Sequence, residues 1–333
     1  MSRIRQITAD RPPGSRQRGV ALVTALLVVS LVTVLAVAMA THQQVDVRLT
    51  GNLVHGEQAY AYALAAESWA RVILRRDESE SDYDSLDEDW ATALPPITVE
   101  GGQVSGKIED LQGRFNINNL VMPDGKVSEA DLAYFQRLLE ILNLEPSLAD
   151  PLIDWIDADI NVRFPDGAED ENYLLGEVPY RTANRTLVSS SELRLVQGFD
   201  QNAMRLLAPY VTALAQRTRL NVNTAPPLVL LALHKDLTMS DVQALITGRG
   251  ETGYPTTDAF LGQEALAGRE LDVSIDVKSH YFLVRTDVLV GESQAHLESL
   301  LARDKGKTRI LYRLRAPIRF EQAPQVDSHG MHE

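Results

Sequence analysis

The side chains of this sequence that are best suited to chemistry are seven carboxylates between Asp154 and Tyr173. The segment reads DWIDADINVRFPDGAEDENY, and Arg163 is its single basic residue. Carboxylates at this density repel one another unless water or a cation lies between them. Hard oxygen donors in a flexible loop suit Ca²⁺, which takes about six to eight oxygen ligands. The segment therefore predicts a calcium site, although its spacing does not follow the EF-hand pattern.

Two other interpretations of this segment remain open. One is a solvated acidic loop, which is the ordinary state of a run of charges. The other is a pair of carboxylates that act as general acid and base in a membrane-tethered periplasmic hydrolase, although no histidine stands nearby in the sequence. Calcium is favoured because apolar residues alternate with the carboxylates, and a buried carboxylate needs a partner. These apolar residues are Trp155, Ile156, Ile160, Phe164 and Tyr173.

The composition excludes several other kinds of site. The chain has no cysteine, so disulfide scaffolds, thiolate zinc sites and cysteine nucleophiles are ruled out. Acidic residues outnumber basic residues 46 to 32, and the net charge of −14 argues against broad contact with nucleic acid. Apolar residues make up 44 % of the chain, which is enough for a folded core.

The N-terminus has the pattern of a membrane anchor. Five arginines and one acidic residue precede Val20, and the run from Val20 to Ala40 carries no charge. As a helix this run spans about 30 Å, the thickness of a bilayer core. The upstream arginines predict a cytoplasmic N-terminus, with the bulk of the chain on the periplasmic side of the bacterial inner membrane. A cleaved secretory signal is the alternative, because Ala36-Val37-Ala38 offers a cleavage site, but the apolar run is long for such a signal.

The junction between RQRG and VALV, at Gly19 and Val20, resembles the class III signal of type IV pilins and type II secretion pseudopilins. The resemblance implies that a prepilin peptidase cuts between these two residues and methylates Val20, and that the apolar helix is retained. Thr24 stands where pilins usually carry the glutamate that docks onto a neighbouring subunit. Among pseudopilins, a missing glutamate is typical of the minor pseudopilin K family, and it implies a subunit with nothing above it.

Helical and strand patterns organise the rest of the chain. Helical spacing continues to about Arg76, and we expect the acidic stretch from Asp77 to Trp90 to be a solvated linker. Alternating patterns predict strands within 97–108, 281–290 and 308–320. The tail after Glu321 is predicted to be disordered.

A sequence echo lies between these strands. The motif RFNINNL, from Arg114, is answered by RLNVNTAP, from Arg219, and apolar helical stretches at 132–142 and 228–233 follow the two copies. The echo predicts two related helical units, with the asparagines closing turns or capping helices. The second copy resembles helix-hairpin-helix modules, but its turn at 234–238 has no glycine. DNA binding, as in a DNA-uptake receptor, is therefore the weakest of the functional alternatives.

Four motifs in order, DWIDAD, GAEDENY, PYRTANR and SSSELRLVQGF, resemble the helical domain of the minor pseudopilin K family of type II secretion systems, and the resemblance runs from Arg18 to near Phe320. It implies an α+β pseudopilin fold with a long N-terminal transmembrane helix, a small antiparallel sheet and a large helical insertion of SAM-like or helix-hairpin-helix-like units. It also implies calcium ligands in that insertion, with Asp154, Asp166, Glu171 or backbone carbonyls as substitutes. The best matches for these ligands are Asp157, Asp159, Glu169, Asp170, Asn184 and Glu192.

The expected domains follow from the patterns and the resemblance together. They are a leader at 1–19, a transmembrane and stem helix at 20–76, the first part of the head at 77–113, helical units at 114–218 and 219–270, the last strands of the head at 271–321, and a tail at 322–333.

The function implied by the resemblance is assembly. The chain is expected to stand at the tip of the pseudopilus, to start its assembly with minor pseudopilins I and J, and to serve the export of folded exoproteins across the outer membrane. The inner-membrane assembly platform and the prepilin peptidase are further implied partners, and contact with exoprotein substrates is left open. No nucleic-acid partner and no enzymatic activity are expected.

Overall fold

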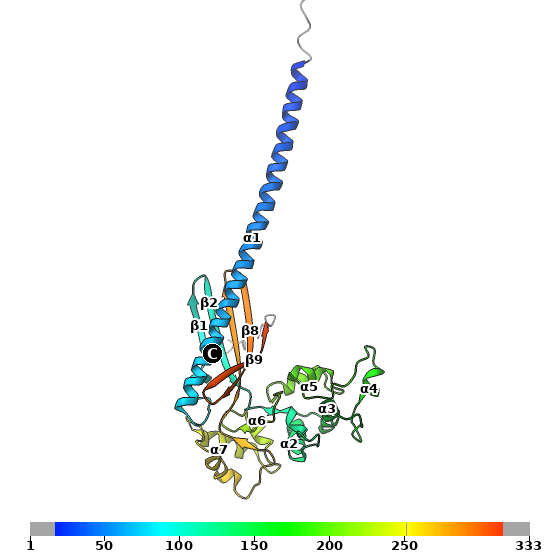
Figure 1. Ribbon diagram of the computed structural model, residues 1–333, viewed down its shortest axis with the longest axis vertical. Helices are drawn as coiled ribbons and strands as arrows, with labels where there is room; N and C mark the ends of the chain where they lie inside the picture. Colours follow the sequence, from blue (N-terminus) through cyan, green and yellow to red (C-terminus); the bar gives the residue numbers. More distant parts are fainter. Residues whose placement is uncertain (1–16, 251, 316–333) are drawn as a thin grey trace, which may run out of the picture. The chain divides into compact units, whose positions relative to one another are not determined.

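The computed structural model describes residues 17–250 and 252–315 of the chain (Figure 1). Residues 1–16 of the predicted leader and the predicted disordered tail lie outside the described residues. The chain divides into two units, residues 1–58 and 59–333. Helix α1 (Gln17–Glu80) contributes to both units and extends beyond Arg76, where the predicted stem ends.

In the first unit, α1 has the character of a membrane span. Its side chains from Val20 to Ala40 are all exposed, and it is the one described helix that is long and apolar enough to cross a bilayer. The hydroxyl of Thr24 donates to the carbonyl of Val20 at 3.0 Å, and Thr33 donates to Val29 at 2.8 Å. Such bonds satisfy the hydroxyls inside the helix itself, which lipid requires of polar groups.

The second unit contains a five-stranded antiparallel sheet in the order β1-β2-β7-β8-β9. The strands are β1 (Leu94–Val99), β2 (Gly102–Asp110), β7 (Tyr281–Val290), β8 (Ser293–Asp304) and β9 (Lys307–Arg315). The strand pair within 97–108 and the strand at 281–290 are confirmed, and the strand from 308 is confirmed as far as Arg315. Strand β8 was not predicted.

The C-terminal part of α1 covers one face of this sheet. Ala59, Ala63 and Leu74 recur at helical spacing and have no exposed surface. They pack against Val288 and Phe282 of β7 and their neighbours in two adjoining clusters. The alanines let the helix backbone approach the sheet closely, and each buried apolar side chain removes hydrocarbon surface from water.

The stretch after α1 differs from the solvated linker expected at 77–90. Asp84 is fully buried, and Trp90, in the short helix η1 (Asp89–Ala91), is 1 % exposed. Asp84 pairs with the buried guanidinium of Arg303, which also bonds Asp77 at 2.7 Å. The prediction was wrong here because a buried cation on β8, distant in the sequence, gives these acidic side chains a partner.

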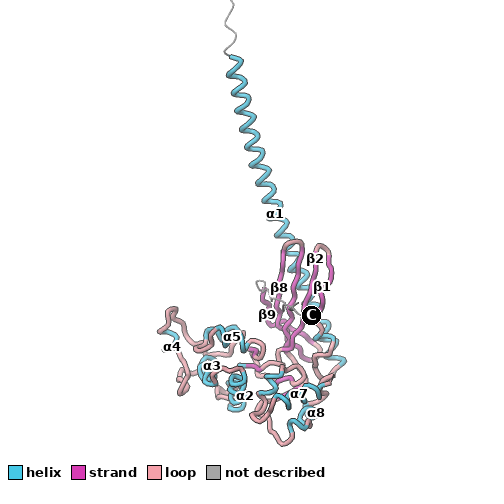
Figure 2. Tube along the Cα trace, turned by 180° about the vertical axis from the view of Figure 1, so that it is seen from behind, coloured by secondary structure: helices cyan, strands magenta, loops and turns pink. Residues whose placement is uncertain are grey.

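A large helical region is inserted between β2 and β7. Its first half contains β3 (Phe115–Asn116), η2 (Ile117–Leu120), α2 (Glu129–Ile141), η3 (Pro146–Leu148), α3 (Ala149–Ile156), α4 (Asp170–Leu174), η4 (Ser190–Leu195), α5 (Gln201–Leu207) and β4 (Val211–Thr212). Its second half contains β5 (Leu220–Asn221), α6 (Pro227–Leu231), α7 (Met239–Arg249), α8 (Thr257–Leu261), η5 (Glu264–Leu266) and β6 (Ile275–Asp276). Figure 2 shows these short helices and loops below the sheet.

The sequence echo marks the start of both halves. Strand β3 pairs in parallel with β4, and β5 pairs in parallel with β6, so each half is closed by a two-residue bridge. In the first half the side chain of Asn116 accepts a bond from the backbone of Asn118 at 3.2 Å, and in the second Asn221 accepts from Asn223 at 2.9 Å. The predicted turn-closing role of the asparagines is confirmed.

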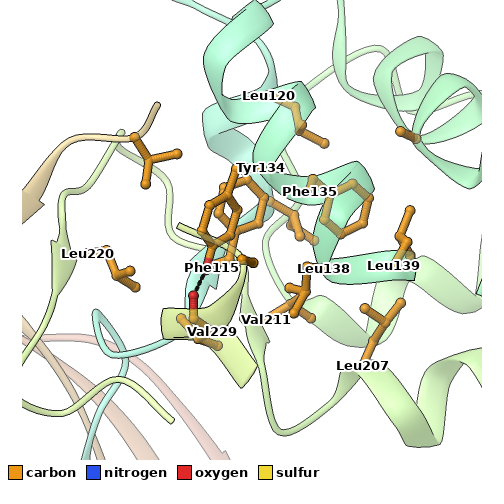
Figure 3. Packing of buried hydrophobic residues seen from close by; sticks show 14 of the residues in the cluster. Phe115, Leu120, Tyr134, Phe135, Leu138, Leu139, Leu207, Val211, Leu220 and Val229 are labelled. Carbon is orange, nitrogen blue, oxygen red and sulfur yellow. Dashed lines mark hydrogen bonds between the residues drawn. The ribbon is translucent and has the colours of Figure 1, made fainter. Parts of the chain in front are cut away.

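One continuous core joins the two halves (Figure 3). The ring of Phe115 stacks on Tyr134 and Phe135 of α2, with centroids 4.9 and 5.6 Å apart. The hydroxyl of Tyr134 donates to the carbonyl of Val229 in α6 at 2.7 Å, so the buried phenol is satisfied by the other half. The helical predictions at 132–142 and 228–233 are confirmed as α2 and α6.

Candidate metal centre

The candidate site begins at the C-terminal end of α3. Asp154 is 1 % exposed, and its Oδ2 accepts a bond from the backbone of Arg163 at 3.1 Å. Gly167 lies against the same carboxylate and against the Arg163 backbone, where a Cβ atom has no room. The loop after α3 therefore folds back onto Asp154, and Oδ1 of this carboxylate is left buried with no hydrogen-bond partner among the described residues.

Three more side-chain oxygens share this condition. Oδ1 of Asp157, Oε1 of Glu169 and Oδ1 of Asn184 are buried and have no hydrogen-bond partner in the described part of the chain. Asp157 caps the end of α3, and Glu169 is the N-cap of α4. Buried polar atoms are almost always satisfied, so orphaned oxygens gathered within one stretch of chain need an explanation.

The second polar atoms of these side chains are held by the protein. Oε2 of Glu169 accepts from the hydroxyl of Thr182 at 3.0 Å. The amide nitrogen of Asn184 donates to the carbonyl of Asp159 at 2.9 Å, which leaves its Oδ1 as the free donor atom for a cation. Asn184 has a positive φ of 45°, a conformation that is uncommon outside glycine. The chain thus fixes these side chains while leaving one oxygen of each without a partner.

The raised pKa values of the carboxylates in this site also favour a bound cation. Burial and, after it, the nearby carboxylates of Asp159, Asp154 and Glu169 together raise the pKa of Asp157 to about 7. Burial likewise raises the pKa values of Asp154 and Glu169, against the lowering effect of their hydrogen bonds. Without a counter-charge, the protein therefore disfavours the ionised form of three neighbouring carboxylates.

Three other predicted ligands have partners of their own. Asp159 is exposed and its Oδ1 accepts from Asn161, and Oδ1 of Asp170 accepts from the backbone and hydroxyl of Thr182. Glu192 forms the capping box of η4, where Oε1 accepts from the backbone of Val188 at 2.7 Å. The structure therefore makes Asp157 and Glu169 electrostatic neighbours of Asp154, which the sequence offered as a substitute, and it ties Asn184 to the carbonyl of Asp159 in the same loop. The signal for Asp154 in the sequence was its position as the single acidic residue of the otherwise apolar helical stretch LIDWI.

The apolar residues of this segment divide into two groups. Trp155, Ile156 and Tyr173 are buried as expected. Ile160 and Phe164 are 74 % and 92 % exposed, so the argument from burial was wrong for these two.

A second group of carboxylates lies near the end of α1. One oxygen from each of Asp77, Asp84 and Glu88 lies within 4.8 Å of the others. Here, however, the protein itself supplies the donors. Arg303 bonds both aspartates, and Oε2 of Glu88 accepts from the backbone of Ser85 and from the Trp90 indole. We interpret this group as a buried ion-pair network, because protein donors already bind its oxygens, whereas the group that includes Asp154 keeps oxygens with no donor among the described residues.

The donor set around Asp154 is made of oxygen alone, with three carboxylates and one amide carbonyl. Hard oxygen donors suit Ca²⁺ and Mg²⁺ rather than zinc or copper, and loop-borne donors of mixed type favour the larger ion. The residues present therefore fit calcium.

The predicted processing residues lie at the start of α1. Gly19 and Val20 are both inside the helix, which begins at Gln17, and Thr24 lies one turn further on. Most of the leader, residues 1–16, lies outside the described residues.

Comparison with known proteins gives one consistent result. Models of type II secretion system (T2SS) protein K match residues 113–216 and 220–278, which correspond to the two halves of the helical region. Type II secretion system protein K of Pseudomonas aeruginosa is 38 % identical over 89 % of this chain and 92 % of its own length. The protein K of Aeromonas hydrophila is 34 % identical over 91 % of this chain and 98 % of its own length.

A solved structure agrees with these relatives. It is a chain of the GspK-GspI-GspJ complex from the type 2 secretion system of enterotoxigenic Escherichia coli. That chain is 29 % identical to this one and aligns with a TM-score of 0.72 over 79 % of this chain and 97 % of its own. The mixed fold of helices and antiparallel sheet is therefore shared over the aligned part of the chain.

Proposed function

The chain belongs to the family of type II secretion system protein K, and on that basis we propose that it is the minor pseudopilin at the tip of the pseudopilus. There it starts assembly together with minor pseudopilins I and J for the export of folded exoproteins across the outer membrane. The observation that carries this proposal is the match to a chain solved as part of the GspK-GspI-GspJ complex.

Two features of the chain support a terminal position. The helical insertion lies between β2 and β7 and adds two helical halves to a sheet of five strands, a volume that hinders the stacking of identical subunits above it. Thr24 turns its hydroxyl onto the carbonyls of Val20 and Ala21. It offers no carboxylate to a subunit above it, so nothing at this position favours a further subunit.

The anchor supports an inner-membrane location. The apolar part of α1 spans the bilayer, with the arginine-rich N-terminus in the cytoplasm and residues 59–333 in the periplasm. A prepilin peptidase removes residues 1–19 and methylates Val20. The assembly platform in the same membrane is a further partner, and the chain acts by assembly rather than by catalysis.

The insertion is proposed to bind calcium. Asp154, Asp157, Glu169 and Asn184 each supply the orphaned oxygen described above. Backbone carbonyls and water complete the shell, and Asp159, Asp170 and Glu192 keep the roles in which their hydrogen bonds hold them. The ion compensates the repulsion between the carboxylates and ties the loop after α3 to the N-terminus of α4.

The test of the tip role is secretion in a strain that lacks the gene for this chain. We expect no pseudopili and no exoprotein in the medium, and recovery of both when the full chain is supplied. The full chain should also co-purify from the membrane with minor pseudopilins I and J. Thr24→Glu should not improve secretion. Normal pseudopili and normal secretion in the deletion strain would contradict the proposal.

A further inference from the structure

A groove of about 1150 Å³ lies on the face of the sheet opposite α1. Strands β7, β8 and β9 form one wall, and η4 and α5 of the helical insertion form the other. Leu111 and Met204 line it from the insertion side, and Tyr312 and Leu314 line it from β9. Figure 1 shows β9 at the margin of the sheet and α5 in the helical region beside it.

Strand β9 is an edge strand beside this groove. It pairs with β8 on one side only. In the described part of the chain, no backbone bond is formed on the outer side of 311–315. Tyr312 and Leu314 point from alternate positions to the groove and are 37 % and 51 % exposed. An open edge with exposed apolar side chains is a template for another strand.

The charges beside the groove are basic, although the chain as a whole is acidic. The lining of the groove carries four arginines, Arg114, Arg194, Arg205 and Arg285, against two acidic residues, in a chain of net charge −14. Arg194 of η4 and Arg205 of α5 line the opposite wall, and neither has a carboxylate within ion-pair distance among the described residues. Arg194 donates to a backbone carbonyl, and Arg205 donates to the amide oxygen of Asn202.

The acidic residues of the groove are already engaged. Glu298 pairs with Arg285 at 3.0 Å, and Oδ1 of Asp200 caps α5 by accepting from the backbone of Ala203 at 2.7 Å. Asp200 keeps its negative charge, but neither Arg194 nor Arg205 forms an ion pair among the described residues, and the lining keeps an excess of basic side chains.

We propose that this groove binds an extended acidic segment of a partner protein, which pairs with β9 as a sixth strand. Its backbone bonds the open edge at 311–315. Side chains at alternate positions of this strand face the groove, where apolar ones pack on Tyr312 and Leu314 and carboxylates face Arg194 and Arg205. Strand addition of this kind draws affinity from main-chain bonds and specificity from alternate side chains. The proposal rests on neither the metal centre nor the terminal position.

The test measures the binding of labelled peptides to the full-length chain in detergent. The probe has about eight residues, the length of an ordinary strand, with threonine at every second position and valine and glutamate in turn at the positions between, so that both kinds of side chain face the groove. A matched peptide replaces each glutamate with lysine, and another replaces two valines with proline, which removes backbone donors at constant charge. We expect the acidic peptide to bind, the lysine peptide not to bind, and the proline peptide to bind at least about tenfold more weakly.

Charge variants of the protein locate the binding site. Arg194→Glu with Arg205→Glu should weaken binding by about tenfold or more. Lys126→Glu with Lys235→Glu makes the same change in net charge at exposed positions outside the groove, and should weaken it by less than about twofold. Melting curves establish that both pairs fold, and amide hydrogen exchange should slow at 311–315 when the acidic peptide binds.

Several results would overturn the proposal. These are equal loss of affinity in the two pairs of variants, equal binding of the proline peptide, and absence of binding at millimolar acidic peptide. A chain that ends at Arg315 tests whether residues 316–333 fill the groove instead. Unchanged affinity in that chain supports an external partner, whereas a gain of about tenfold or more assigns the groove to the chain's own C-terminus.

Discussion

Removal of calcium should lower the stability of the helical insertion, and the effect should depend on Asp157. Calcium that binds the folded chain but not the unfolded chain raises the free energy of unfolding by about 2.7 kcal/mol when free calcium is a hundredfold above Kd. For a unit of this size each kcal/mol corresponds to roughly 2–4 °C in Tm, so chelation should lower the Tm by about 5–11 °C. Magnesium should restore little of this loss, because it requires a tighter octahedral shell.

The variant Asp157→Asn makes the prediction more specific. With calcium present, the variant should melt below the parent chain because a charged ligand is lost. In chelator it should melt above the parent chain, since burial and three neighbouring carboxylates disfavour the ionised Asp157. Asp166→Asn, an exposed acidic residue in the same loop, is the matched control and should change neither value by more than about 1 °C.

Calorimetry and tryptophan fluorescence report the transition, and Trp155, whose ring centroid lies 5.4 Å from that of Tyr173, is the tryptophan nearest in sequence to the candidate site. Elemental analysis of the purified chain reports the metal. Equal Tm values with calcium and with chelator, together with no calcium by elemental analysis, would show that the site is not a calcium site. Identical behaviour of Asp157→Asn and Asp166→Asn would refute the assignment of this ligand.

Three further predictions concern processing, the buried ion pair and pH. Mass spectrometry of the mature chain should find a methylated N-terminus at Val20, and Gly19→Ala should leave uncut precursor in the membrane; a start after Ala38 would instead indicate a secretory signal. Arg303→Met removes one partner of a buried ion pair and should lower the free energy of unfolding by about 3–5 kcal/mol. Arg76→Met removes one partner of an exposed ion pair and should lower it by less than about 1 kcal/mol. Burial raises the pKa of Asp110 from 3.8 to about 6, so the folded chain binds the carboxyl proton more tightly than the unfolded chain and loses stability as the pH rises from about 4 to 6. Urea titrations of Asp110→Asn should not show this loss, and the same dependence of stability on pH in both chains would contradict the prediction.

Much of the secondary structure could be predicted because local patterns agree with the fold. The apolar run, the asparagine echo and the alternating stretch at 281–290 each correspond to an element that forms as its pattern suggests. Strand β8, in contrast, was missed. Its sequence, SQAHLESLLARD, is rich in leucine, alanine and charged residues, which favour helix locally. Hairpin pairing with β7 and β9 on both sides overrides that preference.

The sequence pointed to the segment of the candidate metal centre but not to the individual oxygen atoms that the fold leaves without partners. The density of carboxylates identified the loop after α3, yet which oxygens are free depends on the partners that each side chain finds in the fold. Glu192 is used by the capping box of η4, and Asp170 is used by Thr182. Asp154 enters the site because the backbone at Arg163 binds one of its oxygens and leaves the other buried. Which oxygens remain without a partner is therefore determined by tertiary contacts, and these cannot be deduced from residue types and spacing.

The way the insertion joins the sheet explains how one chain can combine an assembly module with a second domain. Asp110, the last residue of β2, pairs with Phe282 of β7, so the inserted region leaves and re-enters the sheet at adjacent strands. At this junction Asp110 accepts from the hydroxyl groups of Ser279 and Thr224 and from the side-chain amide of Asn221, which ties the second helical half to the end of β2. The sheet closes much as it would around a short hairpin loop. The packing of α1 on β7 and β8 uses no apolar residue of the insertion, so the insertion can carry the candidate metal centre and one wall of the proposed binding groove without altering that packing.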